Sequence, residues 1–102
     1  MKLWNIAAAL VLLAGTGSVL AQDATLARNL AATCANCHGT NGNARGDMKP
    51  LAGLPADTIV ALFRSYKSGA VTGTIMHQIA KGYTDEQIKL IAGHFAAQQP
   101  KK

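Results

Sequence analysis

Apolar residues recur along residues 23–98 at the three- and four-residue spacing of helices, and no stretch shows the alternation typical of a strand. The first helix is predicted to begin at Asp23, whose side chain can cap the N-terminus. Leu26 and Leu30 lie on one face of this helix, which is expected to deliver residues 34–38 at its C-terminal end. The pattern predicts an all-α domain.

A second helix is predicted after residues 39–54, which form a loop rich in Gly, Asn and Pro. It begins at Pro55, which is tolerated in the first turn, and it ends at Gly69, which readily adopts a positive φ. Its apolar stripe has the spacing i, i+3, i+4, i+7 and consists of Ile59, Leu62, Phe63 and Tyr66. This helix is therefore expected to bury one face.

The last helix has the clearest start signal. Thr84 and Gln87 form a Thr-x-x-Gln capping box, and residues 75–81 predict one or two helical turns before it. Residues 100–102 are predicted to be a frayed tail. The expected buried face consists of Ile88, Ile91, Ala92 and Phe95.

Residues 1–21 have the composition of a secretory signal, with a basic start at Lys2, a short apolar core and small residues before Ala21. The alternative is an uncleaved anchor, but a membrane span needs about 20 apolar residues. Cleavage after Ala21 would leave residues 22–102 as one exported, periplasmic domain without a membrane span. Loss of Lys2 lowers the formal net charge from +5 to +4 (5 − 1).

A domain of 81 residues (102 − 21) builds only a thin core, and such domains often depend on a disulfide, a metal or a cofactor. Its basic residues are scattered singly, which disfavours nucleic acid as a partner. The moderate basic excess instead suits an acidic protein surface. Three lysines are candidates for such a surface: Lys49, Lys67 and Lys81.

The strongest chemical signal is the sequence Cys-Ala-Asn-Cys-His at residues 34–38. A Cys-x-x-Cys-His motif attaches one haem covalently, because two thiols at this spacing can add to its two vinyl groups. Cys34 and Cys37 are thus the predicted attachment residues, and His38 is the predicted proximal ligand of the iron.

The two cysteines could also form a redox dithiol, part of a zinc site or a disulfide. A redox dithiol is expected after a strand, and none is predicted before Cys34. A zinc site needs more ligands than two cysteines, and His77 and His94 lack the close pairing found in zinc modules. A plain disulfide or thiol pair also stays open.

A six-coordinate iron needs a second axial ligand. Met76 follows a pliable linker after the second helix and is favoured over Met48, which lies ten residues past His38. His77 is a rival ligand, and an open iron site would instead allow an enzyme or gas sensor. A carbonyl in the loop around Pro50 is the predicted acceptor for the other ring nitrogen of His38.

The chain resembles class I mono-haem cytochromes c across residues 23–98. The resemblance rests on CANCHG, the loop proline, a middle helix, a methionine and then KGYTDEQIKLIAGHF. The resemblance implies three main helices and short turns wrapped around one covalent haem c, with the first and last helices crossing at Leu26/Leu30 and Ile91/Phe95. By position it assigns Cys34 and Cys37 to haem attachment, His38 and Met76 to the iron, and Pro50 to the second shell as backbone acceptor.

Within the family, LAGLPADTIVALFRSYKSG and TIMHQIAKGYTDEQI are similar to the cytochrome subunit of flavocytochrome c sulfide dehydrogenase and to c4- and c553-type cytochromes. The resemblance implies a non-catalytic electron-transfer protein, with a flavoprotein that oxidises sulfide as partner. The alternative is a free periplasmic cytochrome that shuttles electrons between larger complexes. His94 departs from the family pattern, since many relatives have an aromatic residue there, and the change is expected to weaken the helix crossing.

Overall fold

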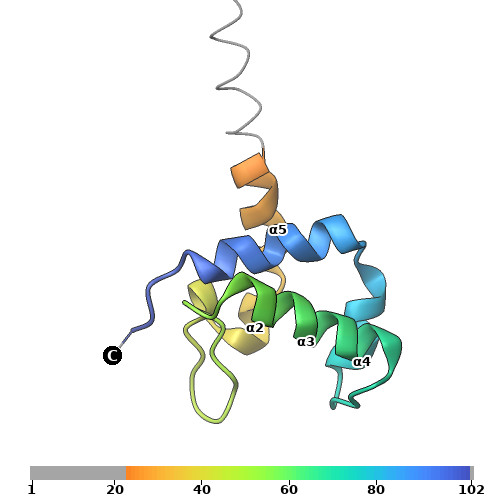
Figure 1. The fold of residues 1–102 in the computed structure, drawn as a ribbon. Coiled ribbons are helices and arrows are strands. Elements are labelled where there is room, and N and C mark those ends of the chain that lie inside the picture. The colour runs from red at the N-terminus through yellow and green to blue at the C-terminus, as the bar shows by residue number, and fades with distance from the viewer. Residues whose placement is uncertain (1–22, 102) are drawn as a thin grey trace, which may run out of the picture.

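The computed structural model describes residues 23–101, which contain helices and turns and no strand (Figure 1). The predicted all-α fold is thereby confirmed. The expected signal segment, residues 1–21, lies outside the described residues. None of the helices in residues 23–101 is long and apolar enough to cross a bilayer.

The first helical segment covers residues 23–32 and ends before the cysteines, so the expectation that it runs into them is wrong. A turn at residues 33–34 follows, and the motif then forms its own short helix, α2 (Ala35–His38). The Thr33 hydroxyl donates a hydrogen bond to the Leu30 carbonyl (3.1 Å). Such side-chain bonds compete with the helical ladder, which accounts for the break.

The loop between α2 and the next long helix begins with a 3₁₀ turn, η1 (Thr40–Gly42). The Gly42 carbonyl accepts hydrogen bonds from the backbone N–H groups of Leu51 (2.8 Å) and Ala52 (3.1 Å), which closes the loop at its base. Gly42 has φ 78°, and a Cβ there would lie 2.9 Å from Cδ1 of Phe95. Glycine is therefore required both by the backbone conformation and by the close approach of Phe95.

Helix α3 (Ala56–Ser68) begins directly after Pro55 and ends at Gly69, which has φ 85° and donates its N–H to the Tyr66 carbonyl. The prediction of this helix is confirmed to within one residue. Ile59 and Phe63 are buried, whereas Leu62, at the edge of the predicted stripe, is 41% exposed. The buried face of α3 is therefore narrower than the apolar stripe that the sequence predicts.

The C-terminal half contains α4 (Met76–Ile79), η2 (Ala80–Gly82) and α5 (Asp85–Ala96). The capping box of α5 is confirmed, since the Gln87 N–H donates to Thr84 Oγ1 (3.1 Å) and the Thr84 N–H donates to Gln87 Oε1 (2.9 Å). All four side chains predicted for the inner face of α5 are buried: Ile88, Ile91, Ala92 and Phe95.

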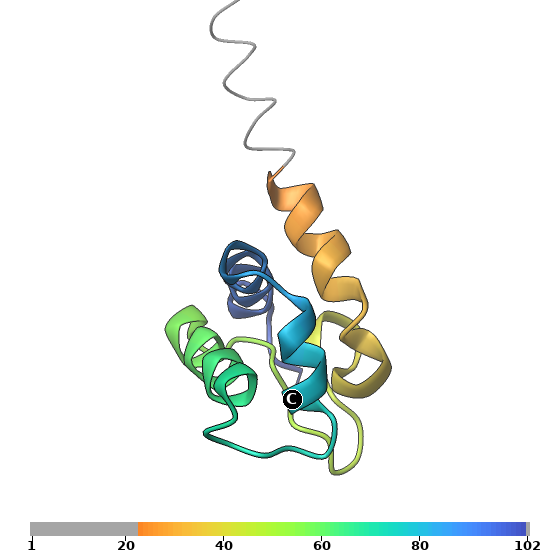
Figure 2. The same ribbon diagram turned by 90° about the vertical axis from the view of Figure 1, so that its right-hand side faces the viewer.

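Helix α5 lies between the first helical segment and α3 (Figure 2). The first segment buries Ala27 and Ala31, whereas Leu26 is 47% exposed. The prediction that Leu26 makes the helix crossing is wrong, while Leu30 does pack against the core. Alanine at the crossing lets the two helix backbones approach closely, because the distance between packed helices depends on side-chain size.

The C-terminal tail is held in place as far as Lys101, contrary to the expectation of fraying. The Asn43 amide donates to the Gln99 carbonyl (3.2 Å), and its Oδ1 accepts from the Lys101 N–H (2.7 Å). The Gly53 N–H also donates to the Phe95 carbonyl at the end of α5 (2.9 Å). The tail is thus fastened to the loop of residues 43–53.

Replacing Asn43 with Ala is expected to lower the free energy of unfolding by about 1 kcal/mol, because two exposed side-chain hydrogen bonds are lost. Chemical denaturation followed by circular dichroism measures the change. Gln99→Ala is the matched control, since the Gln99 carbonyl that accepts from Asn43 is kept. Equal stability of Asn43→Ala and the control would contradict this role for Asn43.

Candidate functional site

The predicted attachment residues lie on a single turn. The His38 N–H donates to the Cys34 carbonyl (2.9 Å), and this bond fixes the turn that presents the residues of the motif. Cys34 is half-buried and packs against the hydrophobic core, whereas Cys37 is exposed. Both cysteines are free thiols in the structure, so neither is used in a disulfide.

The His38 ring is oriented by a hydrogen bond. Its Nδ1 lies 2.8 Å from the carbonyl oxygen of Lys49. A carbonyl only accepts, so Nδ1 carries the proton and Nε2 keeps a free lone pair. This is the tautomer that a metal-ligating imidazole needs when it binds through Nε2.

The acceptor belongs to Lys49, the residue before Pro50, and not to Pro50 itself. A proline restricts the residue that precedes it to extended backbone conformations. Pro50 therefore acts on this hydrogen bond indirectly, by limiting how Lys49 can orient its carbonyl. The predicted acceptor, a carbonyl in the loop of Lys49, Pro50 and Leu51, is therefore the carbonyl of Lys49, whereas the family resemblance placed it at Pro50.

The two methionines lie in different environments. Met76 is the first residue of α4, is half-buried and packs against the same hydrophobic core as Cys34. Met48 lies in the loop and is 45% exposed. Next to Met76, the half-buried His77 has an Nδ1 that is shielded from solvent and has no hydrogen-bond partner among residues 23–101.

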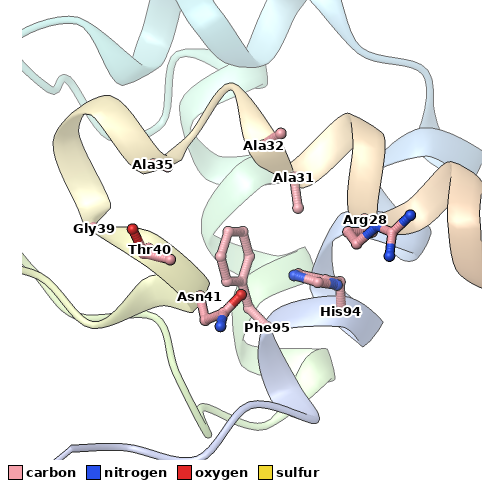
Figure 3. Close-up of a pocket in the computed structure, with 9 residues that line it drawn as sticks. All are labelled: Arg28, Ala31, Ala32, Ala35, Gly39, Thr40, Asn41, His94 and Phe95. Carbon is pink, nitrogen blue, oxygen red and sulfur yellow. The ribbon is translucent and has the colours of Figure 1, made fainter.

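A half-open pocket of about 190 Å³ lies where the first helical segment, α2 and α5 meet (Figure 3). His94, at the position where an aromatic was expected, borders it together with Arg28, Asn41 and Phe95. None of the predicted haem residues lines this pocket, and its volume is below the roughly 300 Å³ at which small-molecule sites begin. The pocket is therefore not a candidate haem site.

One of the three candidate docking lysines, the half-buried Lys67, makes contacts within the protein. Lys67 Nζ donates to the Tyr83 carbonyl (2.6 Å) and lies 3.9 Å from the Asp85 carboxylate. These contacts join α3 to the start of α5. Lys67 is therefore part of the internal framework, while Lys49 and Lys81 are exposed.

Known proteins resemble the chain over most of the described part, although no family model matches it. It is 34% identical to cytochrome c-553 of Desulfomicrobium norvegicum over 71 residues, which cover 67% of this chain and 89% of that protein. It is 31% identical to cytochrome c-554(548) of Halomonas halodenitrificans over 83 residues, which cover 78% of this chain and all of that protein. The chain is a class I c-type cytochrome.

A third relative is the cytochrome subunit of sulfide dehydrogenase from Chlorobaculum tepidum, which is 41% identical over 66 residues. That match covers 65% of this cytochrome and 60% of the relative, so the chain spans less than two thirds of the sulfide dehydrogenase subunit. All three relatives are electron carriers by name, and electron transfer is the activity that they support.

Membership of this family implies haem c as the cofactor, and the structure offers residues that fit it. The thiols of Cys34 and Cys37 are unpaired, and His38 has its Nε2 lone pair free. Met76 and Cys34 come from distant parts of the chain and border one hydrophobic core. A covalently tethered, axially ligated macrocycle requires this set of donors.

The two thiols differ in environment. Burial raises the pKa of the Cys34 thiol, and the nearby Cys37 raises it further, while the neighbouring Thr33 side chain acts in the opposite direction. The thiolate is the nucleophile in alkylation. Cys34 is therefore less reactive than an ordinary cysteine at neutral pH.

In the haem-free chain, iodoacetamide is expected to modify Cys37 several-fold faster than Cys34 at pH 7, with the Cys34 rate still rising with pH where an ordinary cysteine has reached its plateau. Mass spectrometry of quenched peptides measures both rates. In denaturant the two rates should converge. Equal rates in the native buffer would show that Cys34 is not protected as the structure indicates.

Proposed function

We propose that the cytochrome carries single electrons on one haem c, attached to Cys34 and Cys37, with His38 and Met76 as the axial ligands of the iron. The observation that supports this most is the His38–Lys49 hydrogen bond, because it leaves Nε2 free for a metal. The bound haem supplies the one-electron redox chemistry of iron.

The residues around the proposed haem would set the reduction potential and the coordination of its iron. The Lys49 carbonyl fixes the His38 ring and raises its basicity through the Nδ1–H bond. A Met76 thioether raises the reduction potential and leaves no open coordination position for oxygen. The hydrophobic core borders Cys34 and Met76 and would shield the haem from water on that side. With both residues held in this way, His38 and Met76 would remain ligands of the iron in its ferric and its ferrous state.

The preference for Met76 over Met48 rests on burial and support. Met76 is held at the edge of the core by α4, whereas Met48 lies in an exposed loop on the same short stretch of chain as the proximal His38. Residue 76 also lies far from His38 in the sequence, so that its segment would approach the iron independently of the loop that positions His38.

Replacing Met76 with Ala is expected to abolish the sulfur-to-iron charge-transfer band of the ferric protein and to lower the reduction potential, because the thioether is lost. Absorbance spectroscopy and redox titration measure the two effects. Met48→Ala is the matched control and should leave the band unchanged. A band that survives Met76→Ala but disappears in Met48→Ala would reassign the ligand.

The His77 alternative has its own signature. If His77 were the axial ligand, the native protein would lack the charge-transfer band, and its potential would be low, as for bis-histidine iron. In that case His77→Ala, and not Met76→Ala, would open the iron to added ligands.

We further propose that the cytochrome acts outside the cytoplasm and accepts electrons from a sulfide-oxidising flavoprotein. Residues 1–21 support export by their composition. The 41% identity to a cytochrome subunit of sulfide dehydrogenase supports the partner. In such an assembly this chain performs no chemistry on the substrate.

A free carrier is the second candidate. It is favoured by the match to cytochrome c-554(548), which extends over the full length of that protein. The exposed Lys49 and Lys81 would then contribute to transient, salt-dependent docking on larger complexes.

Size-exclusion chromatography of the native periplasmic fraction, with haem and flavin absorbance recorded together, separates the two candidates. As a subunit, the cytochrome is expected to elute with flavin at a size well above that of one small domain. Elution of haem alone at the size of a small monomer would instead identify a free carrier. Absence of haem from the purified chain would contradict the proposed function itself.

A further inference from the structure

Tyr83 lies at the junction between η2 and α5 and contacts two other parts of the protein, the turn at Thr33 and helix α3. Its hydroxyl is 3.0 Å from Thr33 Oγ1. Its ring meets Phe63 of α3 edge to face, with centroids 6.3 Å apart. Its carbonyl accepts from Lys67 Nζ (2.6 Å), also on α3. Tyr83 therefore links the start of α5 to α3 and to the turn before Cys34.

The direction of the Tyr83–Thr33 hydrogen bond follows from the rest of the network. Thr33 Oγ1 donates its single hydrogen to the Leu30 carbonyl (3.1 Å). The Tyr83 hydroxyl must therefore be the donor to Thr33 Oγ1. A chain of two hydrogen bonds thus runs from Tyr83 through Thr33 to the end of the first helical segment.

This hydrogen bond joins the two segments that carry the proposed haem residues. Thr33 immediately precedes Cys34, and Tyr83 closes the α4–η2 segment that begins at Met76. No other hydrogen bond in the described structure connects residues 31–38 with residues 75–83. The bond, called the strap below, therefore connects the turn that carries Cys34 (residues 33–38) with the segment that carries Met76 (residues 76–83, the methionine segment).

The methionine segment is short and only partly buried. Helix α4 has four residues, and Ile75 at its N-cap position makes no side-chain capping bond. Helices this short are unstable in isolation, because the cost of nucleation is not recovered. Ile75 and Ile79 are 55% and 37% exposed, so only part of the segment is packed. On its inner side the segment packs against α3 and the core through the buried Ala80 and the half-buried Met76, and Tyr83 follows at its end.

We propose that Tyr83 is a positioning residue for Met76, acting through its hydrogen bond to Thr33. This inference rests on the proposed function, in which Met76 binds the iron. Loss of the strap leaves the cytochrome folded, because the Phe63 contact does not need the hydroxyl. It increases the fraction of molecules in which the methionine segment has moved and Met76 no longer ligates.

The test measures how readily added imidazole displaces Met76 in the ferric holoprotein. The apparent affinity of a ligand depends on the fraction of molecules in the competent state. Tyr83→Phe and Thr33→Val are each expected to tighten imidazole binding about fivefold, the size of effect expected for one net hydrogen bond. Thr33→Ser keeps the hydroxyl and should bind imidazole as the native protein does.

The double variant Tyr83→Phe/Thr33→Val should bind imidazole no more tightly than Thr33→Val alone, since Thr33→Val already removes the bond to Tyr83 together with the bond to the Leu30 carbonyl. Two independent fivefold effects in the double variant, or unchanged affinity in both single variants, would overturn the proposal. If Tyr83→Phe fails to fold, imidazole affinity in Thr33→Val equal to that in Thr33→Ser would by itself overturn the proposal.

Variants in the Met76→Ala background separate this inference from the proposed function. There the Tyr83→Phe change should no longer affect imidazole binding, because no methionine is left to displace. If Met76→Ala itself leaves the charge-transfer band intact, the proposed ligation fails. If the band disappears in Met76→Ala but Tyr83→Phe has no effect in the native background, only the role of Tyr83 fails.

Discussion

The hydrogen bond between His38 Nδ1 and the Lys49 carbonyl is the constraint on which the arrangement of this site depends. It selects one tautomer, and it can form only if a long loop returns its residue 49 to the α2 turn. Much of the N-terminal half serves that purpose: Gly42 closes the loop at its base, and Asn43 fastens it to the C-terminal tail. The loop is irregular in backbone but is held at several points.

The two sides of the proposed haem site are supported in different ways. On the His38 side, the loop is tied to the end of α5 through Gly53 and Asn43. On the Met76 side, the segment is tied to the start of α5 through the backbone at Tyr83 and through Lys67. Helix α5 thus supports the loop on the His38 side at one end and the segment on the Met76 side at its other end. Its capped N-terminus and buried inner face suit this role.

The sequence predicted the long elements well, because α3 and α5 have both an apolar period and end signals at Gly69, Thr84 and Gln87. It did not predict which face of the first helix is buried, since Leu26/Leu30 and Ala27/Ala31 have the same spacing and only the close approach of α5 selects alanine. The contacts of Asn43, Lys67 and Tyr83 join residues far apart in sequence. No local sequence pattern predicts such contacts, because they form only when distant segments meet in the folded protein.

Rapid one-electron transfer requires that the iron keep its ligands in both oxidation states, so the protein has to restrain segments that have little structure of their own. In this small domain most of the restraint is polar: a carbonyl for His38, an amide for the tail and a hydroxyl pair between Thr33 and Tyr83. The apolar core joins the helices and also borders Met76. Core packing therefore determines the fold, whereas the long-range hydrogen bonds hold the His38 ring and, in our proposal, add to the restraint on Met76.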